Sequence, residues 1–302
     1  MDRALGLDGG GTKTDAAVID RAGTVIARQR TEGLDPTESP HWKVVLGDIA
    51  EKMGAVATAV LGLPYHGEIA QISADQTAVA GALFGAGTTV TNDVAVAFEG
   101  ALGGMDGVLV LAGTGSMAWS RGPLGVHRVG GWGSVFGDEG SAYWIGRAAL
   151  GQISQQLDGR RVETRFAHEM LQDIGVARDG LIGWASDLGH QRARIATVAE
   201  AVSRLAQLGN REAVTLMAEA AHHLGNLGQS ARRLSGAPER WSYAGGVMTD
   251  QAVLAALTDR MGCAPTPPLM PPVGGALVLA AKAAGWDTGP DFMHRLQAGL
   301  AQ

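Results

Sequence analysis

The stretch Ala4-Leu5-Gly6-Leu7-Asp8-Gly9-Gly10-Gly11-Thr12-Lys13-Thr14 decides how the chain begins to fold. Its apolar start predicts a β-strand, and the three consecutive glycines predict a tight loop directly after it. Strand character resumes over residues 15–20, so the loop joins two strands of a hairpin. A dinucleotide-binding loop would open a helix instead, and the spacing does not fit a Walker A loop.

The glycines of this loop indicate phosphate binding rather than a simple turn. Backbone without side chains lets N–H groups approach phosphate oxygens closely. Asp8 stands at the end of the first strand, where we expect its carboxylate to hold a water molecule of bound Mg²⁺. The candidate phosphate-binding residues are Gly10, Gly11, Thr12 and Lys13, with the Thr12 hydroxyl donating to a phosphate.

A weaker copy of this pattern appears at residues 107–129. The run 107–111 predicts a buried strand, Gly113-Thr114-Gly115-Ser116 forms a glycine loop, and two further short strands follow. We interpret the copies as an internal duplication that produces two domains, each opening with a hairpin around a Gly-Thr loop. Taken alone, the second loop is equally consistent with a turn and with a ligand-binding loop.

The remaining pattern indicates an α/β protein. Helical spacing at 42–53 and 68–84 alternates with strand patterns at 56–63 and 88–91, which is typical of parallel strands. After residue 140 the chain is mostly helical up to a strand at 241–244. We expect an N-terminal α/β domain over 1–104, a C-terminal α/β domain with a helical insertion over 105–285, and a segment 286–302 that packs back on the N-terminal domain.

Composition excludes several function classes. Of 302 residues 45 are glycine, about 15% against the usual ~7%, without a collagen-like period. The net charge of −6 and the lack of a Lys/Arg run argue against nucleic acid as a partner. The single cysteine, Cys263, excludes a disulfide framework, a Cys-rich zinc site and a one-chain cysteine-ligated cluster. We expect a soluble, cytoplasmic protein with no membrane partner, present as a homodimer.

Asp93 is the strongest candidate for acid–base chemistry. It follows the β-branched run 88–91, and ligands of open α/β sheets bind at the carboxyl ends of parallel strands. Its carboxylate could accept a hydroxyl proton as a general base. It could also cap the helix that starts at Val94, and the two roles can coexist.

The densest glycine cluster runs from Gly130 to Ser141. Trp132 and Phe136 among these glycines favour a shaped pocket over a flexible loop, and Asp138 and Glu139 are suited to bind sugar-like hydroxyls. The alternative is a loop that one of these carboxylates caps. The pair Gly245-Gly246 after the strand 241–244 is generic when taken alone.

Together these motifs resemble the signatures of the N-acetylglucosamine kinases and the related BadF/BadG/BcrA/BcrD ATPases, within the actin-like ATPase and sugar-kinase superfamily. The most specific part is Gly130-Gly131-Trp132-Gly133 followed by Gly137-Asp138-Glu139-Gly140-Ser141-Ala142-Tyr143-Trp144. The resemblance implies a two-domain actin-like ATPase fold of the ribonuclease H-like type, with a duplicated, β-hairpin-rich α/β domain and a helical second half. The segments that carry it are 4–14, 90–93, 111–116, 130–144 and 243–250.

The resemblance also implies roles for the matching residues. Asp8 would lie near the metal, and Asp93 would be the base that activates the sugar 6-hydroxyl. The implied ATP-binding residues are Gly10, Gly11, Thr12, Lys13, Gly113, Thr114, Gly115, Gly245, Gly246 and Asp250. The implied sugar-binding residues are Ser116, Gly131, Trp132, Gly133 and Asp138, together with His66 and Glu68 from a further substrate loop.

The chain departs from the kinase pattern at two places. The region 33–42 lacks the asparagine that contacts the sugar in the kinases, and the loop 63–68 is bulkier and more polar than usual. Both departures leave the identity of the sugar open. Cys263 stands alone and far from the glycine loops, which argues against the dehydratase activators that bridge an iron–sulfur cluster.

These observations lead to one main hypothesis and two alternatives. We expect an ATP- and Mg²⁺-dependent kinase whose small-molecule partner is a sugar, phosphorylated on the 6-hydroxyl of N-acetylglucosamine or glucosamine. One alternative is an ATP-driven switch of the BadF/BadG type that regulates a partner without phosphorylating a sugar. The other is a sugar sensor without catalytic activity.

Overall fold

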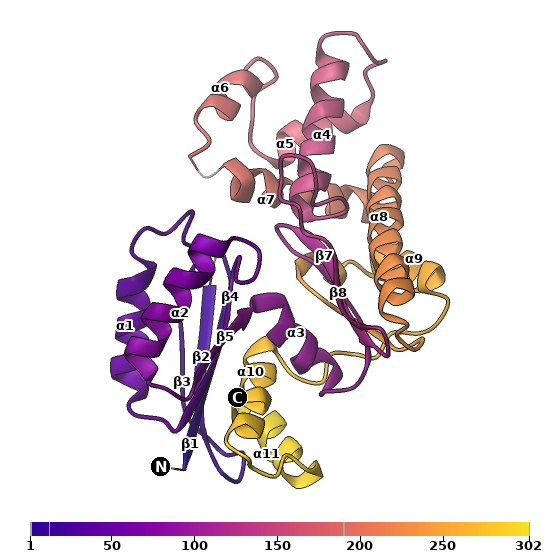
Figure 1. Cartoon of the computed structure of the whole chain (residues 1–302). Coiled ribbons are helices and arrows are strands. Elements are labelled where there is room, and N and C mark those ends of the chain that lie inside the picture. Colours follow the sequence, from indigo (N-terminus) through magenta and orange to yellow (C-terminus); the bar gives the residue numbers. More distant parts are fainter. Residues whose placement is uncertain (1, 12, 190, 302) are drawn as a thin grey trace. The chain divides into compact units, whose positions relative to one another are not determined.

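The chain folds into two units, each built around one β-sheet (Figure 1). The computed structural model describes residues 2–11, 13–189 and 191–301. The first unit comprises residues 1–105 and 267–302, and the second comprises residues 106–266. In the part of the chain that is described, no helix combines the length and apolar character that a bilayer crossing requires.

The sheet of the first unit has the order β3-β2-β1-β4-β5. The first three strands form an antiparallel meander, whereas β1, β4 and β5 run parallel. The carboxyl ends of these three parallel strands therefore share one edge of the sheet. The elements are β1 (Arg3–Gly9), β2 (Lys13–Asp20), β3 (Val25–Glu32), β4 (Thr58–Leu63) and β5 (Thr88–Asn92), with helices α1 (Trp42–Met53), α2 (Ala70–Phe84), α3 (Asp93–Leu102), α10 (Pro272–Ala283) and α11 (Pro290–Leu300).

Helices cover both faces of this sheet because its strands alternate apolar side chains between the two faces. Leu5 and Leu7 of β1 belong to the core under α1, while Ala4 belongs to the core under α10 and α11. Two glycines bring α10 very close to its neighbours. A Cβ on Gly6 would lie 2.5 Å from the Leu277 nitrogen, and one on Gly275 would lie 2.1 Å from the Val96 carbonyl oxygen. Backbone without side chains is therefore required where α10 rests on β1 and α3.

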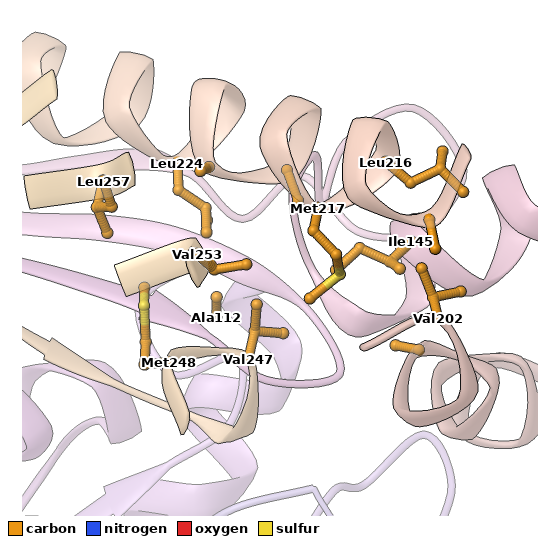
Figure 2. Packing of buried hydrophobic residues seen from close by; sticks show 14 of the residues in the cluster. Ala112, Ile145, Val202, Leu216, Met217, Leu224, Val247, Met248, Val253 and Leu257 are labelled. Atoms are coloured by element: carbon orange, nitrogen blue, oxygen red, sulfur yellow. The ribbon is translucent and has the colours of Figure 1, made fainter. Parts of the chain in front are cut away.

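The second unit repeats the arrangement with the sheet order β8-β7-β6-β9, in which only β6 and β9 are parallel. Its main core packs α8 against the sheet and against α4, α7 and α9; Figure 2 shows part of it, with Met217 of α8 beside Ile145 of α4. The elements are β6 (Gly107–Ala112), β7 (Ser116–Gly122), β8 (Gly125–Gly130) and β9 (Trp241–Ala244), with α4 (Ala142–Leu157), α5 (Arg165–Asp173), α6 (Leu181–Ser186), α7 (Gln191–Gln207), α8 (Arg211–Ser235), the 3₁₀ turn η1 (Gly246–Thr249) and α9 (Gln251–Met261).

The predicted fold class, an α/β protein with two hairpin-led sheets and a helical second half, is confirmed. The division into units differs from the expected domains over residues 267–285, which were assigned to the C-terminal domain. The structure places them in the first unit, because α10 is an almost entirely apolar helix that packs against β1, β4 and α3.

Candidate functional site

Two carboxylates, those of Asp8 and Asp93, lie at the carboxyl edge of the first sheet. Asp8 is next to last in β1 and pairs with Gly62 of β4. Asp93 is the first residue of α3 and follows β5 directly. A Cβ on Gly62 would lie 2.3 Å from Val96 Cγ2 and 3.2 Å from the Asp93 Cα. The glycine at position 62 thus lets α3 begin directly over β4, which brings the Asp93 backbone to the strand that pairs with Asp8.

Both carboxylates are harder to ionise than usual. Burial, followed by the charges of Asp93 and Asp15, raises the pKa of Asp8 to about 7, against a smaller opposing effect of Lys13. Burial also raises the pKa of Asp93 to about 6, although the Val94 N–H opposes the shift, while Glu68 and Asp35 add to it. Carboxylates with pKa values near neutrality are suited to exchange protons with a substrate.

The capping role considered for Asp93 falls largely to its neighbour. Asn92 is the N-cap of α3, and its Oδ1 accepts a hydrogen bond of 3.0 Å from the Val94 N–H. Asp93 Oδ1 shares that same N–H at 2.9 Å. Because Asn92 can satisfy the helix end by itself, the carboxylate of Asp93 is not needed for capping.

The loop that contains His66 and Glu68 is pinned beside Asp93. The Asn92 side chain donates to the Glu68 carboxylate at 2.9 Å and to the His66 carbonyl at 3.1 Å. Gln76 of α2 is fully buried; its amide donates to the Pro64 carbonyl, and its Oε1 lies 3.1 Å from His66 Nδ1. The two predicted residues therefore do reach the same sheet edge as Asp93. Sequence reasoning missed Asn92 and Gln76, because amides that brace a loop through tertiary contacts leave no local signal.

The glycine loop after β1 is closed by its own backbone. The Gly10 N–H donates to the Lys13 carbonyl at 3.0 Å, and the Gly10 carbonyl accepts from the Leu34 N–H at 3.1 Å. Thr12, predicted to contact a phosphate, lies outside the described residues. A Cβ on Gly11 would come within 3.7 Å of Asp35 Oδ2, so the buried Asp35 carboxylate stands beside this loop.

Asp35 is a third residue that sequence reasoning missed. It lies in the region 33–42, where the chain departs from the kinase pattern, and it raises the pKa of Asp93 through its charge. Asp35 Oδ1 accepts from both the backbone N–H and the hydroxyl of Thr37, which is the geometry of an Asx turn. The available signal was the Asp-Pro-Thr sequence, which marks a turn without revealing that the carboxylate faces a glycine loop.

The residues around Asp8 are better suited to a hydrated cation than to one that side chains ligate directly. Among the described residues, no three His, Cys, Asp or Glu side chains gather closely enough to hold a metal ion. Mg²⁺ commonly keeps several of its waters in proteins, and a cation near Asp8 would favour the ionised form that burial and its acidic neighbours disfavour. The donor set is therefore suited to Mg²⁺ held through water.

In the second unit, the start of α4 fixes the loop Gly113–Ser116. The N–H groups of Ala142 and Tyr143 donate to the carbonyls of Gly113 and Thr114, at 2.9 and 3.3 Å. The Gly113 N–H donates to the Gly115 carbonyl at 2.9 Å, which completes a closed turn. The loop is thus rigid before any ligand arrives.

Asp138 is the central side chain of this unit's site. It is buried, has a left-handed φ of 59°, and accepts from the Ser116 N–H at 3.3 Å. Its other oxygen forms an ion pair of 2.8 Å with Arg192 near the start of α7. The Ser116 hydroxyl donates to the Glu139 carbonyl at 2.7 Å, so Ser116 braces the segment from within the protein.

Arg192 is the fourth residue that sequence reasoning missed. A Cβ on Gly115 would lie 2.5 Å from the terminal nitrogen of Arg192, so the guanidinium packs directly over the glycine loop. The Arg192 Nε is buried without a partner among the described residues. A buried, unpaired cationic donor beside such a loop is suited to an anionic ligand. The helical region 150–235 carries no motif, which explains why this arginine was not found.

The predicted segments 130–133 and 243–250 contribute in different ways. Gly131 and Gly133 have left-handed φ values of 73° and 83°, and between them Trp132 is 68% exposed beneath the Arg128 guanidinium. The exposed part of the indole, away from Arg128, is available to a ligand. Asp250, by contrast, caps α9 through the Ala252 and Val253 N–H groups and also accepts from the Ser203 hydroxyl.

Gly245 is required by close packing, since a Cβ there would lie 2.3 Å from the Ala112 carbonyl oxygen. Gly246 opens η1, and no atom would meet a Cβ placed on it within 4 Å. Because β6 and β9 are parallel, Gly245, Gly246 and the loop Gly113–Ser116 lie at one edge of this sheet.

The ion pair between Arg192 and Asp138 makes a stability prediction. Arg192→Gln leaves a buried carboxylate without its cation, so we expect a loss of about 1–3 kcal/mol in the free energy of unfolding. Urea unfolding monitored by circular dichroism measures it. Arg178→Gln, which breaks an exposed ion pair with Glu163, is the matched control and should leave the midpoint unchanged. Equal midpoints for the two variants would contradict a structural role of the Arg192 pair.

Comparison with known proteins places the chain in a family. The model of the BadF/BadG/BcrA/BcrD ATPase family matches residues 5–280. An N-acetyl-D-glucosamine kinase from Dictyostelium discoideum is 25% identical over 284 residues, 85% of this chain and 88% of the relative. An N-acetylmuramic acid/N-acetylglucosamine kinase from Clostridium acetobutylicum is 24% identical over 236 residues, 74% of this chain and 77% of the relative.

A solved structure shares the fold of this chain. It is a proposed N-acetylglucosamine kinase from Chromobacterium violaceum, 25% identical, with a TM-score of 0.74 over 93% of this chain and 99% of that one. The family model covers nearly the whole length over which the motifs were found. The resemblance stated from the motifs is thereby confirmed: the chain belongs to the BadF/BadG/BcrA/BcrD ATPase family.

Proposed function

We propose that the protein is an ATP- and Mg²⁺-dependent kinase that phosphorylates the 6-hydroxyl of N-acetylglucosamine or glucosamine. The observation that carries the proposal is Asp93, whose carboxylate follows a parallel strand, shares the capping of α3 with Asn92 and has its pKa raised to about 6. The family is one of ATPases, and both curated relatives are named as kinases of N-acetylated amino sugars.

The roles follow from the chemistry of each residue. Asp93 accepts the proton of the sugar hydroxyl while that oxygen bonds to the γ-phosphorus and ADP departs. Lys13 and the Gly11 N–H bind phosphate oxygens in the first unit, while the Gly10 N–H closes the loop on the Lys13 carbonyl. In the second unit, Thr114 and Gly115 bind phosphates and Arg192 adds a cation, while the Gly113 N–H closes the turn.

The remaining proposed contacts concern the sugar, the adenosine and the metal. Trp132 presents its indole face to the sugar, while Asp138, held by Arg192, orients the segment that contains Trp132. Glu68 and His66 belong to the loop beside Asp93, where a sugar hydroxyl is activated. Gly246 opens η1 beside the adenosine. Bound Mg²⁺ would neutralise charge on the phosphates, held by Asp8 through water.

The first prediction tests the reaction directly. ADP release is measured with ATP, Mg²⁺ and a panel of N-acetylglucosamine, glucosamine, N-acetylmuramic acid, glucose and mannose. We expect N-acetylglucosamine or glucosamine to stimulate turnover at least tenfold over the sugar-free rate, and we expect the product to carry phosphate on the 6-oxygen by NMR. Turnover that no sugar stimulates would favour an ATP-driven switch instead.

The second prediction concerns the proposed base. Asp93→Asn keeps the shape of the side chain but cannot accept the proton, so we expect kcat to fall roughly 10³-fold while the affinity for ATP stays within about twofold. Asp75→Asn, an exposed aspartate of α2, is the control and should keep full activity. A fully active Asp93→Asn variant would show that Asp93 is not the base and serves only at the start of α3.

The third prediction concerns pH. Asp93 must be deprotonated to act as a base and its pKa is raised to about 6, so sugar phosphorylation should be lost as pH falls through about 6. Glu68 raises this pKa by its charge, so Glu68→Gln should move the acidic limb of the kcat/KM profile to lower pH. Glu38→Gln, an exposed change in the region 33–42, should leave the limb in place. An acidic limb that Glu68→Gln does not move would assign it to another group.

A further inference from the structure

A pocket of about 810 Å³ lies between β3 and α11, within the first unit. Pockets that hold small organic ligands are commonly about 300–1,000 Å³. One wall is formed by β3 and the turn before it, and the other by a single face of α11. Its lining residues are Thr24, Val25, Arg28, Arg30, His294, Arg295, Ala298 and Gly299.

The pocket owes its shape to small residues on α11. A Cβ on Gly299 would lie 2.8 Å from Val25 Cγ2, so the glycine lets the helix touch the strand at the floor. Ala298 beside it adds only a methyl group. The floor is therefore apolar and formed by small side chains, and the longer side chains of the arginines and His294 surround it.

The pocket is cationic in a chain whose net charge is −6. Three of its eight lining residues are arginines, one is a histidine and none is acidic. Asp15 accepts from Arg28 Nε at 3.0 Å, from Arg28 Nη2 at 2.8 Å and from Arg30 Nε at 3.2 Å. Asp20 accepts from the Thr24 N–H at 2.9 Å. The three arginines of the pocket outnumber these two carboxylates.

Arg30 and Arg295 are anchored so that their outer nitrogens stay available. Arg30 Nε donates to Asp15 at 3.2 Å, although 71% of its side chain is exposed. Arg295 Nε donates to the Ala22 carbonyl at 2.7 Å. Within the described residues, no hydrogen bond engages the terminal nitrogens of either guanidinium. Each arginine is held at its inner nitrogen and presents a fork of donors, which matches the oxygens of a phosphate group.

The floor of the pocket lies at the far end of the sheet from the candidate functional site. Thr24 and Val25 lie beside Asp20 and Ile19, at the end of the hairpin where Asp20 pairs with Arg3. The glycine loop 9–13 and Asp8 are at the opposite end of that hairpin. Arg30 lies opposite Asp15 in the sheet, and Asp15 lies opposite Asp8, so this arginine is two strands away from Asp8. The apolar floor at Val25 is the part of the pocket that is remote from the glycine loop.

From this geometry we propose that the pocket between β3 and α11 is a second binding site, which takes a small organic phosphate. Arg30 and Arg295 bind the phosphate from opposite walls, and the floor of Val25, Ala298 and Gly299 receives the organic part. The site does not depend on the proposed kinase activity.

Isothermal titration calorimetry with inorganic pyrophosphate and glucose 6-phosphate tests the proposal. The nucleotide and sugar are held at saturating concentration, with a non-hydrolysable ATP analogue, so that the phosphate-binding loops are occupied. We expect saturable binding at one site, and an at least tenfold weaker affinity in the double variant Arg30→Gln/Arg295→Gln. Ala298→Glu, an exposed change that places a carboxylate in the pocket, should weaken binding to a similar degree.

The control is Arg3→Gln/Lys52→Gln, which removes the same charge from exposed positions outside the pocket and should change the affinity by less than twofold. Circular dichroism verifies the folding of every variant. The proposal is overturned if binding does not saturate, if the control weakens it as much, or if the pocket variants leave it unchanged. Tighter binding of citrate than of pyrophosphate would overturn the choice of phosphate.

Discussion

The close packing of α10 against β1 and α3 is the contact on which the first unit depends. Gly6 and Gly275 remove the side chains that would hold these backbones apart. Helix α10 comes from the last part of the chain, so the C-terminal segment covers a face of the sheet that the N-terminal segment forms. Gly62 then sets α3 directly on β4, and the start of α3 carries Asp93.

This packing has an electrostatic consequence. Asp8 and Asp93 end up partly buried at one edge of the sheet, with Asp35 and Glu68 close enough to add to the repulsion on Asp93. Keeping acidic groups together in this way costs free energy, because burial and like charge both disfavour ionisation. Such an arrangement is useful where a cation and a proton donor are to bind, which is what phosphoryl transfer requires.

In the second unit, an ion pair as well as close glycine contacts holds the candidate site residues in place. Asp138 joins the loop Gly113–Ser116, the segment after β8 and helix α7, because Ser116 and Arg192 both donate to it. The helical region therefore contributes to the site through one arginine. Elsewhere in the protein, Arg30 of β3 and Arg295 of α11 are held in the opposite manner, by the inner Nε rather than by a terminal nitrogen.

The sequence by itself determined the family, the glycine loops and the order of strands and helices, because these depend on local patterns of apolar residues and glycines. It also singled out Asp93, since a polar residue directly after a strand is visible in one dimension. Only the tertiary structure decided that Asn92 shares the capping of α3 with Asp93 and that Asp250 is bonded to α9 and Ser203. It also showed that Asp35, Gln76 and Arg192 support the site. These roles arise from contacts between residues far apart in the chain, or from competition between neighbours for one N–H group, and neither leaves a mark in a local pattern.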